Sequence, residues 1–105
     1  MEKTLNFTID GKEYTLSFTR ETVIATEKKG FRMAEIADTP IFSLTTLWRG
    51  AFLAHHPTLS VTEIDEILNK IEKKGLLDAL IDLYTAPLES LMENDEKNVV
   101  KWTVN

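Results

Sequence analysis

The sequence predicts an α+β fold that is mainly α-helical, with an N-terminal β-hairpin followed by about four main helices. Apolar and polar residues alternate only near the N-terminus, over residues 3–18. From Thr19 onward, apolar residues recur at helical spacing. Capping residues and glycines divide this second part into separate helices. We therefore expect the hairpin at 3–18 and the helical part at 19–93.

The predicted hairpin has a turn signal at Asp10-Gly11, a pair that suits a type I′ turn. The apolar residues that alternate around the turn are Leu5, Phe7 and Ile9 before it and Tyr14, Leu16 and Phe18 after it. An isolated hairpin is marginally stable, so its apolar face must dock on helices or on strands of another copy. Because this is the only predicted β element, edge pairing between hairpins is our hypothesis for a homo-oligomer.

The first two helices are predicted from their ends. Thr19 is a cap for a short helix through Lys29, with Gly30 as the residue that follows it. After a helical turn over 33–37, Asp38-Thr39-Pro40 predicts the start of a central helix. This helix covers 41–55 and ends before Pro57.

The central helix is apolar on two sides, which predicts that it is sandwiched. One broad arc contains Ile41, Leu44, Leu47, Trp48, Ala51, Phe52 and Ala54. Phe42 and Leu53 lie on nearly the opposite side of the helix.

The third helix begins with the capping box Ser60-Val61-Thr62-Glu63 and runs to about Lys73, where Lys73-Lys74-Gly75 closes it. Its apolar residues form one narrow stripe, which is ordinary for a helix that docks on a core. The stripe consists of Val61, Ile64, Ile67, Leu68 and Ile71.

The last helix, over 76–93, has an apolar arc of about 180°, wider than the ~100° that docking on its own core requires. The arc contains Leu76, Leu77, Leu80, Ile81, Leu83, Tyr84, Pro87, Leu88, Leu91 and Met92. The residues opposite the arc are acidic, namely Asp78, Asp82, Glu89 and Glu93. The register continues across Pro87, which predicts a kinked helix or two coaxial pieces. The far edge of the arc is either core or a partner-binding surface, formed by Leu77, Ile81, Leu88 and Met92.

We interpret residues 1–93 as one globular domain and 94–105 as a short C-terminal tail. The tail is either mobile or a strand that pairs only in an assembly. Its apolar residues are Val99, Val100, Trp102 and Val104.

Composition excludes several partner classes. Twelve Lys and Arg against 17 Asp and Glu leave a net charge of −5, and no basic cluster is present, so nucleic acid is not an expected partner. With no cysteine, disulfides and thiolate metal sites are excluded. The N-terminus lacks the pattern of a signal peptide, and no stretch reaches the ~18 apolar residues of a membrane span. We expect a soluble protein that is neither secreted nor membrane-bound.

The polar residues predict neither an enzyme nor a cofactor or metal site. His55 and His56 are adjacent, and neighbouring residues diverge by ~100° on a helix, which makes a poor chelate. We interpret His55 as partly packed and His56 as a partner of the helix dipole. The acidic residues near the start of the third helix suit that dipole as well. No nucleophile elbow or phosphate-binding loop is present.

Several segments, in order, resemble a known family. They are Phe7-Thr8-Ile9-Asp10-Gly11-Lys12-Glu13-Tyr14, Phe18-Thr19-Arg20-Glu21-Thr22, Lys28-Lys29-Gly30-Phe31, Gly50-Ala51-Phe52, His55-His56-Pro57, Tyr84, Pro87-Leu88-Glu89, Asp95-Glu96-Lys97-Asn98-Val99 and Trp102. Together they resemble the small tail assembly chaperones of long-tailed bacteriophages and prophages of Gram-positive bacteria, over nearly the whole chain.

The resemblance implies that the protein works in the host cytoplasm, binds and solubilises the tape measure protein, and helps recruit tail tube subunits during virion assembly. It also implies a second, longer form made by a ribosomal frameshift. The alternative is a structural virion subunit, such as a head–tail connector or completion protein, which would explain the same apolar face and a possible oligomer.

Overall fold

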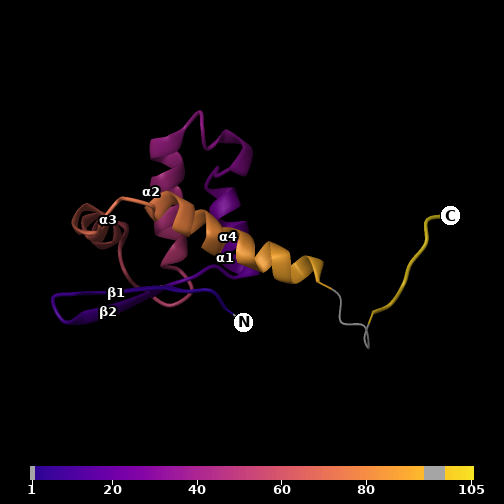
Figure 1. The fold of residues 1–105 in the computed structure, drawn as a ribbon, viewed down its shortest axis with the longest axis horizontal. Helices are drawn as coiled ribbons and strands as arrows, with labels where there is room; N and C mark the ends of the chain where they lie inside the picture. The colour runs from indigo at the N-terminus through magenta and orange to yellow at the C-terminus, as the bar shows by residue number, and fades with distance from the viewer. Residues whose placement is uncertain (1, 94–98) are drawn as a thin grey trace.

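The computed structural model describes residues 2–93 and 99–105 and has the predicted α+β, mainly α-helical architecture (Figure 1). Within these residues, a two-stranded antiparallel hairpin precedes four α-helices and a short 3-10 helix. In chain order the elements are β1 (Leu5–Ile9), β2 (Lys12–Leu16), α1 (Arg20–Lys28), η1 (Met33–Glu35), α2 (Pro40–Ala51), α3 (Val61–Lys70) and α4 (Leu76–Met92).

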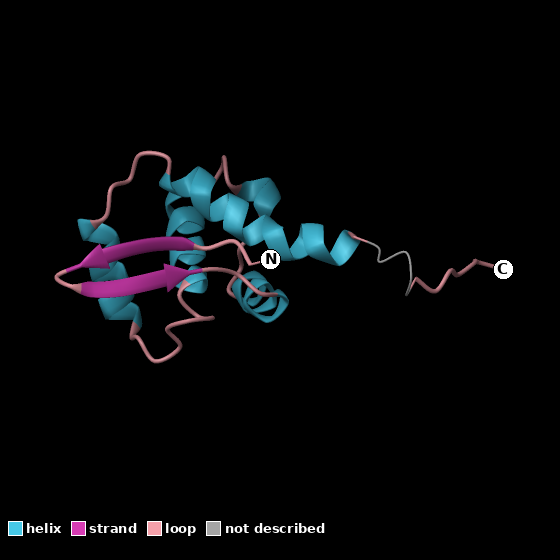
Figure 2. Cartoon of the chain, turned by 60° about the horizontal axis from the view of Figure 1, so that its bottom comes forward, coloured by secondary structure: helices cyan, strands magenta, loops and turns pink. Residues whose placement is uncertain are grey.

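The hairpin has the predicted turn. Asp10 and Gly11 have φ angles of 51° and 78°, and a type I′ turn requires positive φ at both central positions. The register pairs Ile9 with Lys12 beside the turn, so the alternating apolar side chains of both strands share one face. That face packs against the helical core, and Figure 2 shows the hairpin lying across the helices.

The predicted caps begin α1 and α3. The Thr19 hydroxyl accepts a hydrogen bond from the backbone N–H of Thr22 at 3.2 Å, and the Thr22 hydroxyl accepts one from the N–H of Thr19 at 2.8 Å. Ser60 and Glu63 form the same reciprocal arrangement at α3. Each capping box satisfies backbone donors that the first turn leaves free. As predicted, Gly30 follows α1 with a left-handed φ of 104°.

The prediction that the central helix reaches His55 is wrong, because α2 ends at Ala51. An α-helix continuing to His55 would need the Ala51 carbonyl to accept from the His55 N–H. That carbonyl instead accepts from the N–H of Ser17 at 3.1 Å, which ties the end of the hairpin to the end of α2. Thr39 does occupy the predicted cap position, yet its hydroxyl donates backwards to the Glu35 carbonyl at 3.0 Å.

The prediction for the end of the third helix is also wrong. The last residue of α3 is Lys70, and Ile71 is extended and packs partly against the core. The chain therefore leaves the helix before Lys73. Gly75, predicted to close this helix, lies instead at the N-cap of α4 with a φ of 75°.

The core is centred on Trp48 of α2, whose side chain is fully buried. Its indole N–H donates to the Ile64 carbonyl of α3 at 2.8 Å, so the polar edge of the ring is satisfied inside the core. The ring stacks on Phe7 of β1, with centroids 5.9 Å apart, and meets Phe52 edge to face at 5.1 Å. Trp48 therefore joins the hairpin, α2 and α3.

A second aromatic group fixes α4 to the start and end of α1. Tyr84 meets Phe18 and Phe31 edge to face, with centroids 5.1 and 4.9 Å apart. As predicted, the helix continues through Pro87, since α4 is one helix of 17 residues. Within the described parts of the chain, no helix is both long and apolar enough to cross a membrane.

The two hairpin edges differ, which bears on the hypothesis of edge pairing between copies. On the β2 edge, the Thr15 N–H donates to Nε2 of His56 at 3.1 Å, and the Ser17 N–H is used as described above. On the β1 edge, the register turns the backbone groups of Asn6 and Thr8 outward. A strand from another copy would therefore have to pair with β1.

The tail prediction is covered only in part. Residues 94–98, which include most of the motif Asp95-Glu96-Lys97-Asn98-Val99, lie outside the described residues. Residues 99–105 are exposed, have no helix or strand, and extend away from the helices (Figure 1). Trp102 is 80% exposed, so it does not pack into the core formed by the described residues.

Gly50 allows α1 and α2 to approach each other closely, which gives a testable prediction. A Cβ at Gly50 would collide with the Thr26 hydroxyl and lie 3.0 Å from the Phe18 ring. We expect Gly50→Ala to lower the free energy of unfolding by about 1–3 kcal/mol, as overpacking usually does, measured by urea denaturation. Combining it with Thr26→Ala should recover part of the loss, and a Gly50→Ala variant as stable as the wild type would contradict this close packing.

Candidate partner-binding surfaces

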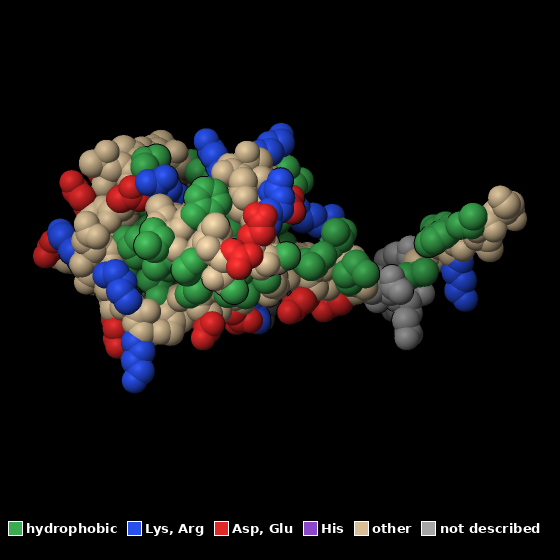
Figure 3. Space-filling model, turned by 90° about the horizontal axis from the view of Figure 1, so that it is seen from above, with side chains coloured by type: hydrophobic (Ala, Val, Ile, Leu, Met, Phe, Trp, Pro, Cys, Tyr) green, Lys and Arg blue, Asp and Glu red, His purple; other side chains and the backbone are tan. Residues whose placement is uncertain are grey.

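The C-terminal end of α4 is an exposed apolar surface. Leu80 and Leu83, in the first half of the helix, are buried in the core, whereas Leu88, Leu91 and Met92 are 58%, 52% and 74% exposed. Figure 3 shows hydrophobic side chains continuing to this end of α4, with acidic side chains beside them. We call residues 88–93 the α4 tip.

The structure divides the predicted partner-binding residues into two pairs. Leu77 and Ile81 pack partly against the core, so only part of each side chain is open to a partner. Leu88 and Met92 are exposed. The prediction omitted Leu91, because the helical projection places it near the buried side of the arc. Leu91 is exposed because the core ends before this residue along α4, and the helical projection does not show where the core ends.

The acidic side of α4 faces solvent. Asp78, Asp82, Glu89 and Glu93 are all exposed, and the last turn contains no basic residue. Asp82 forms an ion pair with Lys3 at 3.2 Å, and both side chains are solvent-exposed, so this pair contributes little to stability. The α4 tip therefore combines apolar side chains with negative charge.

A second apolar surface is a groove between α1, α2 and α3, which we call the α2 groove. Its volume is about 360 Å³. The lining side chains are mostly apolar or small, and they include Ala25, Thr26, Phe42, Thr46, Gly50, Leu53, Leu59, Val61 and Ile64, together with Lys29 and Arg49. None of them belongs to α4.

The groove corrects the prediction that the central helix is covered on both sides. Phe42 and Leu53 remain 45% and 40% exposed, because α1 and α3 flank this side of α2 without closing over it. Ile41, assigned to the covered arc, is 82% exposed because it lies at the first turn of α2. Val61, assigned to the stripe of α3, is 53% exposed at the start of that helix.

The rim of the α2 groove contains basic side chains. Arg49 makes a bidentate ion pair with Asp65 of α3, with N–O distances of 3.0 and 2.6 Å. The hydrogen bonds from Arg49 lower the pKa of Asp65, and those to Asp65 raise the pKa of Arg49. Lys29 lines the groove at the end of α1, next to Lys28, and neither lysine makes an ion pair within the described residues.

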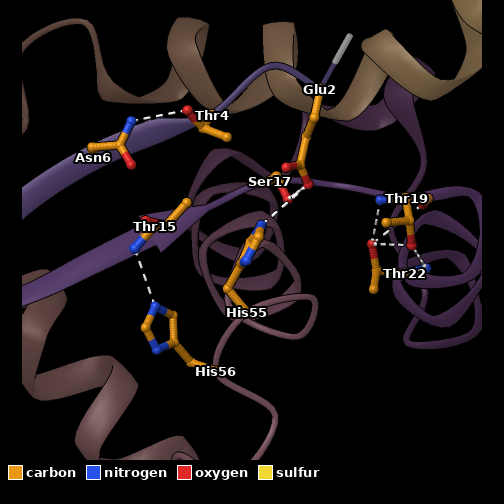
Figure 4. A network of polar contacts seen from close by, with 9 residues as sticks. All are labelled: Glu2, Thr4, Asn6, Thr15, Ser17, Thr19, Thr22, His55 and His56. Carbon is orange, nitrogen blue, oxygen red and sulfur yellow. Dashed lines mark hydrogen bonds and ion pairs between the residues drawn. The ribbon is translucent and has the colours of Figure 1, made fainter.

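The two histidines, which follow the end of α2, contact the N-terminal part of the chain: His55 contacts Glu2, and His56 contacts Thr15 of the hairpin (Figure 4). Nε2 of His55 lies 3.1 Å from the Glu2 carboxylate, which also accepts from the Ser17 hydroxyl at 2.6 Å. These hydrogen bonds, the one from Ser17 foremost, lower the pKa of Glu2. His55 and Glu2 are both solvent-exposed in part.

His56 is the more buried histidine, and the interpretation of its side chain as a partner of the helix dipole is wrong, whereas His55, with a side chain 37% exposed, is partly packed. Its ring lies 5.4 Å from that of Tyr14 and 5.9 Å from that of Phe52. Burial lowers the pKa of His56, and the charges of His55 and Lys12 lower it further. A neutral ring that accepts from Thr15 is not a cationic partner of the helix dipole.

The comparisons with known proteins give a family without a described function. The sequence model of a family described as "Domain of unknown function (DUF5055)" matches residues 1–105. No curated protein and no solved structure matches the chain. The resemblance to phage tail assembly chaperones therefore stays a prediction.

The environment of His56 predicts a loss of stability on acidification. Because the folded pKa lies below the ordinary value of 6.5, the unfolded chain binds a proton in this pH window that the folded chain does not. Stability should therefore decrease as pH falls through about 6.5, by at most about 1.4 kcal/mol per pH unit.

The measurement is urea unfolding at ~pH 7.5 and ~pH 5.5, a window in which histidines titrate. The matched control is His56→Gln, whose amide oxygen can accept from Thr15 but does not titrate. We expect the variant to lose less stability on acidification than the wild type. An equal loss in both proteins would contradict this role for His56.

Proposed function

This chain belongs to the DUF5055 family, and we propose that it is a non-enzymatic phage tail assembly chaperone that binds and solubilises the tape measure protein. Two things support the proposal: the sequence resemblance to such chaperones and the exposed apolar surface at the end of α4. The proposed place of action is the host cytoplasm, where tail tube subunits would be recruited around the client.

The α4 tip is the observation that carries the proposal. Leu88, Leu91 and Met92 expose apolar surface that a helix-rich client can cover, as amphipathic helices cover apolar grooves and faces. Met is suited to this task because its flexible side chain adapts to different partners. The exposed acidic side chains of Glu89 and Glu93 lie beside them and would keep the complex soluble.

The small size of the α4 tip suits a client that must later be released. Burying each exposed apolar side chain contributes at most about 1.5–3 kcal/mol, and association itself costs about 4 kcal/mol or more. Three such side chains therefore support reversible binding. Stable retention of a long client would require several copies of this chain along it, which is multivalent binding.

Co-expression tests the proposal. We expect this chain to raise the soluble yield of the tape measure protein, identified as the long, helix-rich product of a neighbouring reading frame, and to co-purify with it. The variant Leu88→Ser with Met92→Ser should lose most of that gain, because it removes apolar surface from the α4 tip. The control is Ile41→Ser, which removes an apolar side chain from α2 that is more exposed than Leu88 or Met92. A gain that is equal for both variants would assign binding to another surface.

Particle composition separates the chaperone from a structural virion subunit. Peptide mass spectrometry of purified particles should find this chain missing or scarce if it leaves during assembly. A fixed stoichiometry in finished particles would instead support the head–tail connector or completion protein.

A further inference from the structure

We propose that the α4 tip of one copy binds in the α2 groove of a second copy, so that the chain assembles head to tail. This inference goes beyond the proposed function and does not depend on a client.

The two surfaces are complementary in hydrophobicity. The α4 tip projects Leu88, Leu91 and Met92 from the end of a helix, and each is more than half exposed. The α2 groove is a concave site of about 360 Å³, with exposed Phe42 and Val61 among its lining residues. Both are surfaces that a single copy leaves in contact with water, and docking would cover both.

The two surfaces are also complementary in charge. The α4 tip has Glu89 and Glu93, no basic residue, and the negative end of the helix dipole. The groove has Lys29 on its rim, with Lys28 adjacent and Arg49 held by Asp65. In a chain with a net charge of −5, the lysines on this rim attract an acidic helix end.

The fold keeps the α4 tip of a chain out of that chain's own groove. At ~100° per residue, the α2 residues that line the groove form one stripe, and those that pack into the core form a stripe on the opposite side. The groove stripe consists of Phe42, Thr46, Arg49 and Gly50, and Leu53, which follows the end of α2, also lines the groove. The core stripe consists of Leu44, Leu47, Trp48 and Ala51. The helix α4 packs on α1 and α2 without lining the groove, so the α4 tip must come from another copy.

The contact joins two different surfaces, so it is heterologous. After two copies pair, one copy still has a free α4 tip and the other still has a free α2 groove. Further copies can therefore add at both ends, which produces either a closed ring or an open filament. Assembly would also cover the α4 tip, so self-association and client binding would compete for the same residues.

The test is the oligomeric state of the full chain, measured by sedimentation velocity over a range of concentrations. We expect the mass of the wild type to rise beyond that of a dimer. Val61→Glu introduces negative charge into the groove, and Met92→Lys introduces positive charge at the tip. Each should weaken association about tenfold or more, because an exposed apolar contact is replaced by a charge. Both charges are favoured at their helix ends, so the fold should be retained.

Mixing the two variants is the decisive experiment. A Val61→Glu copy keeps an intact tip and a Met92→Lys copy keeps an intact groove, so a mixture should form 1:1 pairs that grow no further. The residual contact between the two altered surfaces is an exposed ion pair, which is too weak to extend the pair. If Val61→Glu unfolds, Leu53→Glu replaces it as the groove variant, and if Met92→Lys unfolds, Leu88→Lys replaces it as the tip variant.

Other outcomes overturn the proposal. A wild type that stays monomeric excludes it, and so do variants that associate as the wild type does, which would point to the β1 edge. Loss of association in Val100→Lys and in Val61→Glu, with Met92→Lys unaffected, would make the tail the occupant of the groove. Client binding is separable, because Val61→Glu should still solubilise the tape measure protein through its intact tip, whereas Met92→Lys should not.

Discussion

The burial of Trp48 is the constraint on which the rest of the structure depends. A fully buried indole needs a hydrogen-bond acceptor, and only the Ile64 carbonyl supplies it, which fixes where α3 lies against α2. The same ring provides the surface on which Phe7 stacks, so the hairpin gains the support that two strands alone lack. One side chain therefore sets the relative positions of three elements.

The α4 tip is exposed because α4 is longer than the core against which it packs. Seventeen residues at 1.5 Å each make a helix of about 25 Å, and its buried side chains all lie in its first part, from Leu76 to Tyr84. Tyr84, between Phe18 and Phe31, is the last buried side chain along the helix. Beyond it, the apolar pattern continues while the core does not, so the surface at the α4 tip is a consequence of element lengths.

The α2 groove has a similar origin, on the side of α2 that faces away from the core. Gly50 lets α1 approach α2 at the Thr26 hydroxyl, and Arg49 ties α3 to α2 through Asp65. These two contacts hold the flanking helices without placing a side chain over Phe42 and Leu53. The chain therefore has two unfilled apolar surfaces of opposite shape, one projecting and acidic, one concave with a basic rim.

Local interactions were determined by the sequence itself. The Asp10-Gly11 turn, the caps at Thr19 and Ser60 and the continuous last helix depend on neighbouring residues, and all were predictable. Contacts between distant residues were decided only by the tertiary structure. The helix α2 ends at Ala51 because the backbone N–H of the distant Ser17 takes the hydrogen bond of the Ala51 carbonyl. The pKa of His56 is lowered because the hairpin helps to bury its ring. Packing also decided which apolar faces stay exposed. The periodicity of the sequence shows which side of a helix is apolar, but it does not show how far neighbouring elements cover that side.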